Sequence, residues 1–246
     1  MRIALFSDIH GNREAFAACL EHARQHQPDR IVLLGDHVGY GADPAWVVQQ
    51  VQELVAQGAI AITGNHDEAA WKGPGGLNAT AAAAMAWTRQ RLAPEALDFL
   101  KALPLEVEED DRLYVHADAS DPAAWHYVTE QEEARRSLVA TTQRLTFCGH
   151  VHTPRLYGIT ATDKLTAFRP VGGVPVPLPR PRQWLAVLGA VGQPRDGDPA
   201  ACWGLLDCAN SQFTWHRVPY DVAAAADKIR DAGLPESLAA RLYRGL

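Results

Sequence analysis

The sequence predicts an α/β protein in which two β-sheets stack on one another between two layers of helices. Up to residue 67, short apolar runs alternate with stretches of helical periodicity, a βαβαβ rhythm that favours parallel strands. After residue 104 the pattern changes to short strand-like runs with one charged helix among them, which indicates a second sheet. The 246 residues can bury a substantial core, and we expect a single domain, 1–246, because no convincing linker divides them.

In the first part of the chain, apolar runs are separated by residues that start or stop helices. Pro28 ends a stretch of helical periodicity, and Asp43-Pro44 is typical of a helix start, with an N-cap and a proline in the first turn. Gly58 closes the helix that begins there. We therefore expect strands at Arg2–Phe6, Ile31–Leu34 and Ala59–Thr63, and helices at Arg13–Gln25 and Pro44–Gln57.

The middle of the chain continues with helices and then with short strands. Residues 71–77 are rich in glycine and predict a mobile loop beside the ends of the first strands. An alanine-rich helix at Asn78–Leu92 is expected to pack on the sheet. Beyond it we expect helices at Pro94–Ala102 and Glu130–Val139, and strands at Leu105–Val107, Arg112–His116, Leu145–Cys148 and Arg155–Ile159.

Residues 169–182 contain five prolines, so this segment cannot be a central strand. We expect an edge hairpin or an extended loop there. The remaining apolar runs predict closing strands and two terminal helices within 221–243. Their expected bounds are Trp184–Leu188, Cys202–Asp207 and Gln212–Val218 for the strands, and Asp221–Ala232 and Pro235–Tyr243 for the helices.

Composition and charge argue against several classes of protein. The formal net charge of −6 disfavours a general binder of nucleic acid or of anionic membranes. No apolar run approaches the length of a membrane span, and Met1 leads straight into the first expected strand without a secretory leader. The four cysteines form no CxxC pair, so we expect reduced thiols and a cytoplasmic protein. The oligomeric state is open between a monomer and a homodimer.

Side chains that bind metals follow four of the expected strands, at the point where each strand ends. The strand at 31–34 leads into Gly35-Asp36, and the others lead into Asp8-Ile9-His10, Gly64-Asn65-His66-Asp67 and Gly149-His150-Val151-His152. Because the carboxyl ends of parallel strands open on one crevice, we expect one shared site with Asp36 at its centre. If the backbone stays extended through residue 10, the two-residue period points Asp8 and His10 the same way.

Seven side chains are candidate metal ligands, and they mix imidazole nitrogens with carboxylate and amide oxygens: Asp8, His10, Asp36, Asn65, His116, His150 and His152. This set suits Mn, Fe, Zn, Co or Ni better than Ca or Mg. It is too large for one tetrahedral ion and fits two ions that share a bridging carboxylate, for which Asp36 is the natural choice. Only two of the ligands are negative, so the site would keep positive charge for a phosphate to neutralise.

Two such ions suit phosphoryl transfer. At a separation of about 3.5–4 Å they clamp the attacking and departing oxygens, and they lower the pKa of a bound water toward about 7. The transition state then needs positioning and charge stabilisation more than covalent help. We assign His66 to face the substrate, where it protonates the leaving oxygen or stabilises phosphoryl charge, and Asp67 to hold that imidazole in its productive tautomer. His37 adjoins Asp36, and the sheet period should point it away.

Each of these motifs also has a purely structural interpretation. A DxH at a strand end is usually a turn with a surface histidine, and Gly-Asn-His-Asp is a good turn sequence by itself. Their occurrence at successive strand ends favours the metal site. The remaining histidines fall in no such pattern and are interpreted as surface or core residues: His22, His26, His126 and His216.

At these residues the chain resembles the calcineurin-like metallophosphoesterases, and most closely their small single-domain bacterial and archaeal branch. The family's five blocks occur in order: DxH at Asp8 and His10, GD at Asp36, GNH at residues 64–66, a lone histidine at His116, and GHxH at residues 149–152. The resemblance implies a four-layer αββα sandwich of two stacked mixed β-sheets flanked by helices. It also implies two ions of manganese, iron or zinc, with His66 as the catalytic histidine. The implied ligands are Asp8, His10, Asp36 and His152 for the first ion, and Asp36, Asn65, His116 and His150 for the second.

The resemblance further implies hydrolysis of phosphodiesters, phosphomonoesters or dinucleoside polyphosphates. We expect a small phosphorylated substrate, either a phosphodiester or a nucleotide-like phosphoanhydride. A phosphomonoesterase or protein phosphatase, and a non-catalytic scaffold, are the alternatives. Asn12, Arg13 and Arg195 are the candidates for contacting the substrate. Asp118, which stands where relatives often have serine, is expected either to contact a metal-bound water or to cap a turn.

Overall fold

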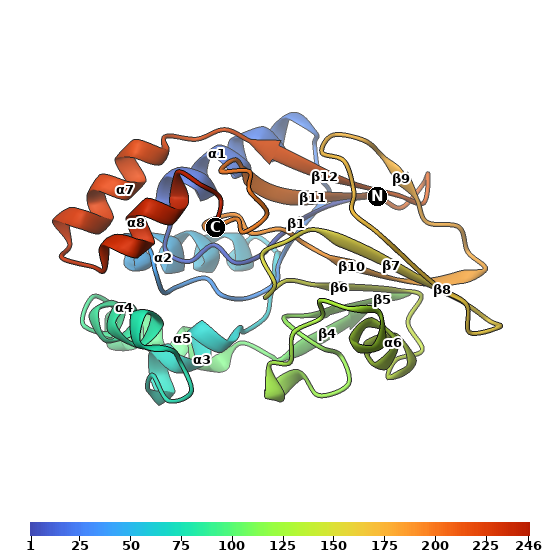
Figure 1. Cartoon of the computed structure of the whole chain (residues 1–246), viewed down its shortest axis with the longest axis horizontal. Coiled ribbons are helices and arrows are strands. Elements are labelled where there is room, and N and C mark those ends of the chain that lie inside the picture. Colours follow the sequence, from blue (N-terminus) through green and yellow to red (C-terminus); the bar gives the residue numbers. More distant parts are fainter.

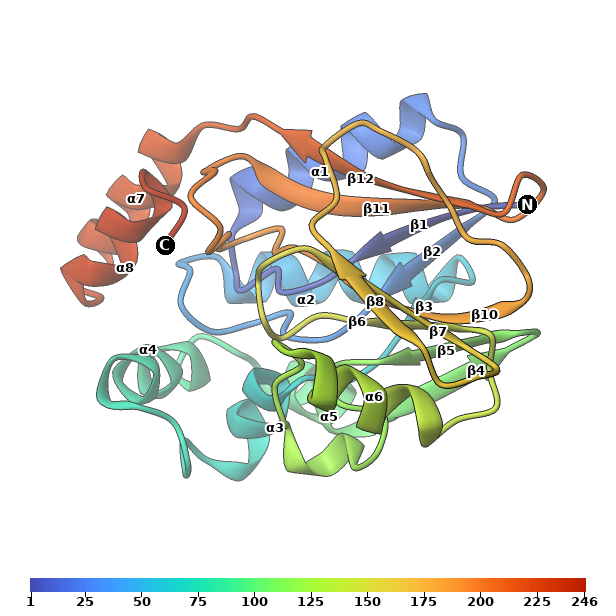
Figure 2. The same cartoon turned by 45° about the vertical axis from the view of Figure 1, so that its right-hand side comes forward.

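Two six-stranded mixed sheets lie against one another in the computed structural model, which describes all 246 residues (Figures 1 and 2). The strand order in the first sheet is β3-β2-β1-β11-β12-β9, and in the second it is β4-β5-β6-β10-β7-β8. The first sheet contains β1 (Arg2–Phe6), β2 (Arg30–Leu33), β3 (Ile60–Ala61), β9 (Val176–Pro177), β11 (Ala201–Asp207) and β12 (Gln212–Val218). The second contains β4 (Glu106–Glu109), β5 (Arg112–Val115), β6 (Leu145–Cys148), β7 (Arg155–Thr160), β8 (Leu165–Phe168) and β10 (Arg182–Val187).

Each sheet combines parallel and antiparallel pairs. In the first sheet β1, β2 and β3 are parallel, with Leu5 opposite Val32, and β11 runs antiparallel to β1. In the second sheet β5, β6 and β10 are parallel, and β4 and β7 pair antiparallel at their flanks. The parallel strands of both sheets therefore supply the ends at which the polar loops begin.

Helices cover the outer faces of the two sheets and one end of the stack. α1 (Arg13–Gln25) and α2 (Pro44–Ala56) lie on the first sheet, and α6 (Gln131–Val139) lies on the second. The other helices gather at the end where the parallel strands terminate: α3 (Asn65–Lys72), α4 (Ala79–Arg89), α5 (Pro94–Ala102), α7 (Val222–Asp231) and α8 (Glu236–Leu242), with a short 3-10 turn at Pro122–Ala124. The predicted αββα layering is confirmed.

The core explains why the first strands are apolar at every position. In β1, Ile3 and Leu5 point between the two sheets, whereas Ala4 and Phe6 point toward α1. A strand that is covered on both faces needs apolar side chains in both directions, so its sequence does not alternate. The layer between the sheets also buries Phe147 and Trp215 from opposite sides.

Two helices near the strand ends differ from expectation. α3, over residues 65–72, was not predicted, and its last two residues overlap the loop expected at 71–77; the Asp67 carboxylate accepts a hydrogen bond from Gly64 N (3.0 Å) and so caps the helix. The helix expected to pack on the sheet, α4, instead contacts α3, and its Ala81 and Ala84 belong to an apolar cluster with residues of α7 and α8.

The edges of the two sheets are short and half-exposed. β8 was not predicted, because Leu165–Phe168 has no continuous apolar run. The proline-rich segment leaves β8, pairs with β12 at Val176–Pro177 on the edge of the first sheet, and returns to the second sheet at β10. No helix in the structure has the length and apolar character that a membrane span requires.

Candidate metal centre

The loops that follow β1, β2, β5 and β6 bring the predicted ligands into two groups that share one residue. The first ligand group is Asp8, His10, Asp36 and His152, and the second ligand group is Asp36, His116 and His150. Within each group the ligand atoms lie within 4.8 Å of one another, and every one of these residues is buried. Asp36 is the shared member, as the sequence predicted.

One oxygen of Asp36 lies between the two groups. Asp36 Oδ2 is 3.6 Å from His10 Nε2 and 3.5 Å from His116 Nε2. The other oxygen, Oδ1, accepts a hydrogen bond from the backbone N–H of His66 at 2.8 Å, which holds the carboxylate in place. Oδ2 thus lies within 3.6 Å of an imidazole of each ligand group.

Backbone carbonyls set the orientation of three of the imidazoles. In each of them Nδ1 lies within hydrogen-bond distance of a carbonyl, so the ring is held with its Nε2 lone pair directed into the cluster. The three contacts are His10 Nδ1 to Val38 O (3.2 Å), His116 Nδ1 to Leu34 O (2.6 Å) and His152 Nδ1 to Gln193 O (2.6 Å). This outer layer of contacts is typical of metal-binding histidines.

The polar atoms that face the cluster are those a cation would satisfy. Asn65 Oδ1, His116 Nε2 and His150 Nε2 are buried and have no hydrogen-bond partner. His10 Nε2 and His152 Nε2 are 3.1 Å apart, a usual separation for two nitrogens on one ion. Buried polar atoms are almost always paired, so unpaired lone pairs that converge on buried carboxylates fit a metal site. The mixed nitrogen and oxygen set fits transition metals.

Five of the ligands have a left-handed backbone: Asp8 (φ 56°), His10 (φ 51°), Asp36 (φ 52°), His150 (φ 66°) and His152 (φ 61°). The expectation of an extended backbone through His10 was therefore wrong. Asp8 and His10 still converge, because both residues leave the strand conformation in the same way. Non-glycine residues rarely adopt this conformation, and clusters of them occur where surrounding structure compensates the strain at functional sites.

Two glycines of the motifs are explained by packing against the carboxylates. A Cβ on Gly64 would overlap Asp36 Oδ1, and a Cβ on Gly149 would overlap Ser7 Oγ and Asp8 Oδ2. The backbone N–H of His150 bonds to Asp8 at 3.1–3.2 Å, which requires this close approach. The glycines therefore allow the loops to approach the aspartates closely enough for their N–H groups to hold them.

The carboxylates remain ionised despite their burial. Burial acts to raise the pKa of Asp8, but the imidazoles of His152 and His116 outweigh it and hold the pKa below its usual range. The pKa of Asp36 is likewise held well below its usual value, because His116 and His66 outweigh the effect of burial. Both aspartates therefore offer negative charge to a cation at neutral pH.

The imidazoles of His10 and His150 are neutral, which is the form that binds a metal. Burial lowers the pKa of His150 to about 3 and that of His10 well below its usual value. Burial acts in the same direction on His116, but Asp36 raises its pKa to about 9. The carboxylates thus favour a positive charge beside His116 Nε2, where the second ligand group would hold an ion.

His66 lies beside the cluster and not in it. Its ring is 4.8 Å from that of His10 and 4.5 Å from that of Tyr40, measured between centroids. Its Nδ1 is buried without a partner against Gly39, where a Cβ would overlap it. Burial lowers the pKa of His66, so the ring is neutral. The tautomer with its proton on Nε2 avoids burying an unpaired N–H group.

Asp67 does not orient His66, contrary to the prediction. Its carboxylate accepts hydrogen bonds from Gly64 N, His37 N (2.9 Å) and Val38 N (3.2 Å), and it pairs with His37 Nδ1 at 2.8 Å. Asp67 therefore joins the start of α3 to the loop after Asp36. His37 belongs to neither ligand group and points to this carboxylate instead.

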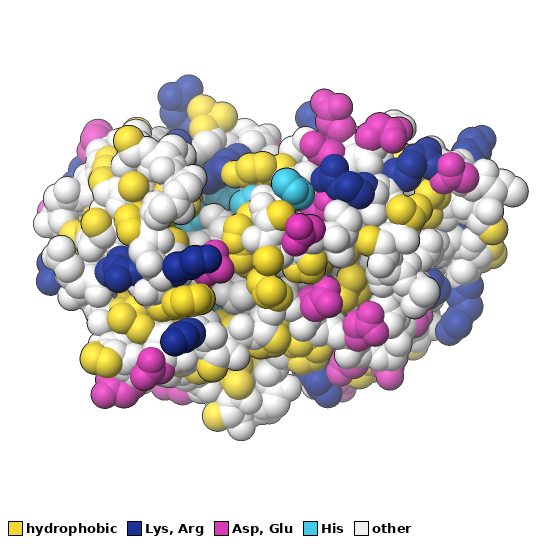
Figure 3. All heavy atoms as spheres, turned by 90° about the horizontal axis from the view of Figure 1, so that it is seen from below, with side chains coloured by type: hydrophobic (Ala, Val, Ile, Leu, Met, Phe, Trp, Pro, Cys, Tyr) yellow, Lys and Arg dark blue, Asp and Glu magenta, His cyan; other side chains and the backbone are white.

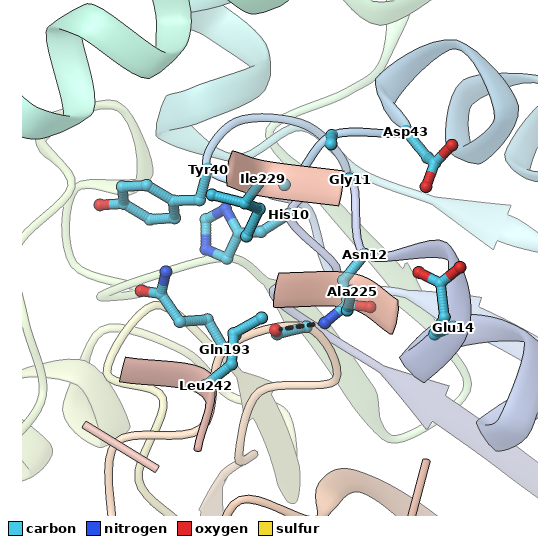
Figure 4. A pocket seen from close by; sticks show the side chains of 13 residues that line it. His10, Gly11, Asn12, Glu14, Tyr40, Asp43, Gln193, Ala225, Ile229 and Leu242 are labelled. Carbon is cyan, nitrogen blue, oxygen red and sulfur yellow. Dashed lines mark hydrogen bonds between the residues drawn. The ribbon is translucent and has the colours of Figure 1, made fainter. Parts of the chain in front are cut away.

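The predicted substrate contacts divide into one that reaches the site and two that do not. Asn12 caps α1 by accepting from Ala15 N, and its amide donates to Gly192 O at 2.8 Å, so its polar atoms are engaged (Figure 4). Arg13 is exposed and lies over Trp46, 5.1 Å from the ring centroid. Only Arg195 lies near the centre: its guanidinium is 5.8 Å from the centroid of the Tyr40 ring.

Two further residues near Arg195 were not predicted. Gln193 Oε1 accepts from Arg195 (3.0 Å) and from Arg241 of α8 (3.1 Å), so two cations meet at one amide. Burial, and then the charge of Arg195, lower the pKa of Arg241. Nothing in the sequence around residue 241 signals this, because the pairing depends on how α8 folds back. Asp118 accepts from Ser120 and Arg136, which fits the turn-capping expectation.

A groove of about 720 Å³ opens beside His66 and the second ligand group. Aromatic and polar side chains line it, among them Tyr40, Asn65, Lys72, Trp125, Tyr127 and His150. Figure 3 shows histidine side chains at the bottom of a depression on this face, with cationic and hydrophobic side chains around it. A cavity behind His10, drawn in Figure 4, measures only about 10 Å³ and is too small for a substrate.

Known proteins share the sequence pattern and the fold of this chain. The sequence profile of the calcineurin-like phosphoesterase superfamily domain matches residues 1–211. An uncharacterized protein of Methanocaldococcus jannaschii is 33% identical over 250 residues, which cover 99% of this chain and 98% of that protein. A metallophosphoesterase from Sphaerobacter thermophilus is 35% identical, with a TM-score of 0.88 over 100% of this chain and 99% of the other. A hypothetical protein from Pyrococcus horikoshii shares the fold, with a TM-score of 0.81 at 18% identity over 100% and 98% of the two chains.

Proposed function

Because the chain belongs to the calcineurin-like phosphoesterase superfamily, whose enzymes are metal-dependent phosphoric ester hydrolases, we propose that it hydrolyses a phosphodiester or a nucleotide-like phosphoanhydride. The substrate would be a small phosphorylated molecule. The observation that carries this proposal is the position of Asp36 Oδ2, 3.5–3.6 Å from a histidine of each ligand group. Manganese, iron or zinc fits the donor set.

The first ligand group would hold one ion, and the second ligand group together with Asn65 would hold the other. When bound, such a pair supplies charge stabilisation for the phosphoryl group and a water of lowered pKa for in-line attack. Asp36 would set the spacing of the pair, because its Oδ1 is held by the N–H of His66 while Oδ2 remains available. The carbonyls of Val38, Leu34 and Gln193 keep the imidazoles aimed at the pair.

His66 is the residue of this chain that we assign to the reacting phosphoryl group. Its Nδ1 faces Gly39, so Nε2 is left to face the groove that His66 lines. An N–H at this position donates a hydrogen bond to a phosphoryl or leaving-group oxygen, where charge grows in the transition state. To act as a general acid the ring must first take up a proton as imidazolium, which the negative charge of a bound phosphoryl group favours; it would then pass that proton to the leaving oxygen and return to neutral imidazole.

The groove favours a substrate with an aromatic or nucleoside group. Its volume of about 720 Å³ is in the usual range for a site that binds a small molecule. Tyr127 is 50% exposed and stacks on His150 with ring centroids 4.1 Å apart, which leaves its outer face open. Base stacking on such a ring contributes about 1–3 kcal/mol. Arg195 and Arg241 would attract further phosphate groups.

The test compares substrates and one variant. We expect the protein with manganese to cleave bis-p-nitrophenyl phosphate and a dinucleoside polyphosphate with higher kcat/KM than p-nitrophenyl phosphate. His66→Ala should lower kcat by about 10²–10⁴-fold. Because His66 is outside both ligand groups, the variant should retain two metal ions per chain by elemental analysis.

Two results would count against the proposal. Equal turnover by the wild type and His66→Ala would remove His66 from the reaction. A clear preference for the monoester would replace the proposed substrate class by the phosphomonoesterase alternative, while leaving the metal centre in place.

A further inference from the structure

Three histidines outside the metal centre meet on the outer face of the first sheet. His22 and His26 lie one turn apart on and just after α1, and His216 lies on β12, which packs beside that helix (Figure 2). We call these three residues the histidine triad. Their ligand nitrogens lie within 4.8 Å of one another, and their ring centroids are 4.5–5.3 Å apart.

The histidine triad has no other polar partner. None of its three imidazoles takes part in a side-chain hydrogen bond or an ion pair, and His22 Nδ1 and His216 Nε2 are buried and unpaired. The apolar neighbour is Trp203, whose ring stacks on His216 with centroids 4.5 Å apart. Polar atoms in such surroundings are normally paired, so the convergence of three imidazoles calls for a ligand that accepts their lone pairs.

The imidazoles of His22 and His216 are neutral, which makes their lone pairs available. Burial lowers the pKa of His216 to about 4, and His26 and His22 act in the same direction. Burial and His26 also lower the pKa of His22. No carboxylate contributes to either shift, so nothing in the surroundings favours a proton over a metal ion at neutral pH.

We propose that the histidine triad binds one divalent late first-row transition-metal ion, of which zinc is the representative, and thereby joins α1 to β12. Three imidazoles with one open position, filled by water, form an established zinc environment. Imidazole ligands also suit nickel and copper. In a tetrahedral site the nitrogens are about 3.4 Å apart, since each lies about 2.0–2.1 Å from the ion. The three rings are only partly buried, and the proposal requires their side chains to shift until the nitrogens reach this distance.

This site is separate from the catalytic centre. His22 follows Asn12, the N-cap of α1, by ten residues, which corresponds to about 15 Å along a helix. The ion would bind at the C-terminal end of α1, whereas the N-terminal end of α1 follows the loop that contains Asp8 and His10. Its effect is therefore on the attachment of α1 to the sheet, and the proposal does not depend on the substrate of the enzyme.

The experiment measures metal uptake by the holoenzyme, with its catalytic centre loaded with manganese, after addition of zinc. We expect the wild type to bind one equivalent more than His26→Gln under identical treatment. Zinc at a free concentration of about 100 times its Kd should raise the Tm of the wild type by about 5–10 °C, because it binds only the folded state. The Tm of His26→Gln should not rise. His126→Gln removes an exposed histidine outside the triad and should behave as the wild type. His26→Gln should retain phosphoesterase activity, because His26 does not touch the catalytic centre.

A second measurement needs no variant. Cobalt added to the manganese-loaded wild type should shift or broaden the NMR signals of the His22, His26 and His216 rings together. The proposal is overturned if the wild type and His26→Gln bind the same number of zinc ions. It is equally overturned if cobalt leaves these three rings unaffected, and this result stands even if His26→Gln fails to fold.

Discussion

The candidate metal centre and the histidine triad both gather imidazoles, but the side chains are positioned in different ways. In the candidate metal centre, His10, His116 and His152 each have one nitrogen against a backbone carbonyl, and several of the ligands have a left-handed backbone. In the histidine triad, the side chains project from or just after a regular helix and from a strand, and no hydrogen bond orients them. The comparison shows two ways of gathering ligands. One uses strained loops held by the surrounding structure, and the other uses the spacing of regular elements.

The largest expected effect tests the shared carboxylate. Asp36→Asn cannot offer a charged oxygen to both ligand groups, so we expect the loss of most bound metal from the centre. Activity should fall well beyond the roughly 10–100-fold that removal of an outer-shell partner causes. Elemental analysis and diesterase assays measure both. Zinc uptake by the histidine triad should be unchanged, and two tightly held ions in this variant would contradict the bridging role.

The next effect tests the close approach of backbone to carboxylate. In Gly149→Ala the new Cβ would overlap Ser7 Oγ and Asp8 Oδ2, so the loop must move and carry His150 and His152 with it. We expect a loss of about 1–3 kcal/mol in stability, as for other overpacked sites, together with weaker metal binding. Gly75→Ala is the matched control, because a Cβ there meets nothing within 4 Å. Equal metal affinity in the two variants would show that the centre does not need this approach.

A smaller effect on the metal centre, with a larger one on stability, is expected at the link between α3 and the loop after Asp36. Asp67→Asn places an amide N–H among backbone donors, so we expect a loss of about 2–4 kcal/mol in urea unfolding. Asp227→Asn, an exposed change on α7, is the control. Asp67 does not touch His66, but its charge acts to raise the pKa of that imidazole, so the pH dependence of kcat should shift toward lower pH in Asp67→Asn while activity falls. An unchanged pH profile would contradict this effect of Asp67 on His66.

The smallest effect concerns pH and the histidine triad. The folded state lowers the pKa of His216 to about 4, below the usual value of about 6.5 expected when unfolded. Between these values the unfolded chain binds more protons, so stability is complete above about pH 6.5 and is lost as the pH falls toward 4. Urea unfolding of metal-free protein at pH 7.5 and 5 should show a larger loss for the wild type than for His216→Asn. Identical losses would contradict this coupling.

Much of the fold follows from local sequence signals. Apolar runs predicted the strands, and proline and glycine residues predicted where helices begin and end. Most predicted bounds are close to the observed ones, as for Arg13–Gln25 and Leu145–Cys148. One helix was missed where tertiary contacts decided the structure. Gly-Asn-His-Asp can form a turn, but it begins α3 because Asp67 caps that helix and bonds to the neighbouring loop.

The metal ligands were predictable because each follows a strand, and strand ends meet at one edge of an α/β sheet. The histidine triad was not, because only His22 and His26 have a helical spacing and His216 lies far along the chain. Arg241 was missed for the same reason. Its place beside Gln193 depends on how the last helix folds back over the site.

The sequence by itself determined the kinds of ligand present, the strand ends that carry them and the layered architecture, because these depend on residue chemistry and on short-range periodicity. The tertiary structure decided which oxygen of Asp36 lies between the two groups, which nitrogen of each imidazole faces inward, and which partner Asp67 holds. Those outcomes depend on carbonyl and N–H groups from distant loops. The amino-acid types in a loop do not show where its backbone N–H and C=O groups will lie. Only the assembled fold brings these groups to the ligands.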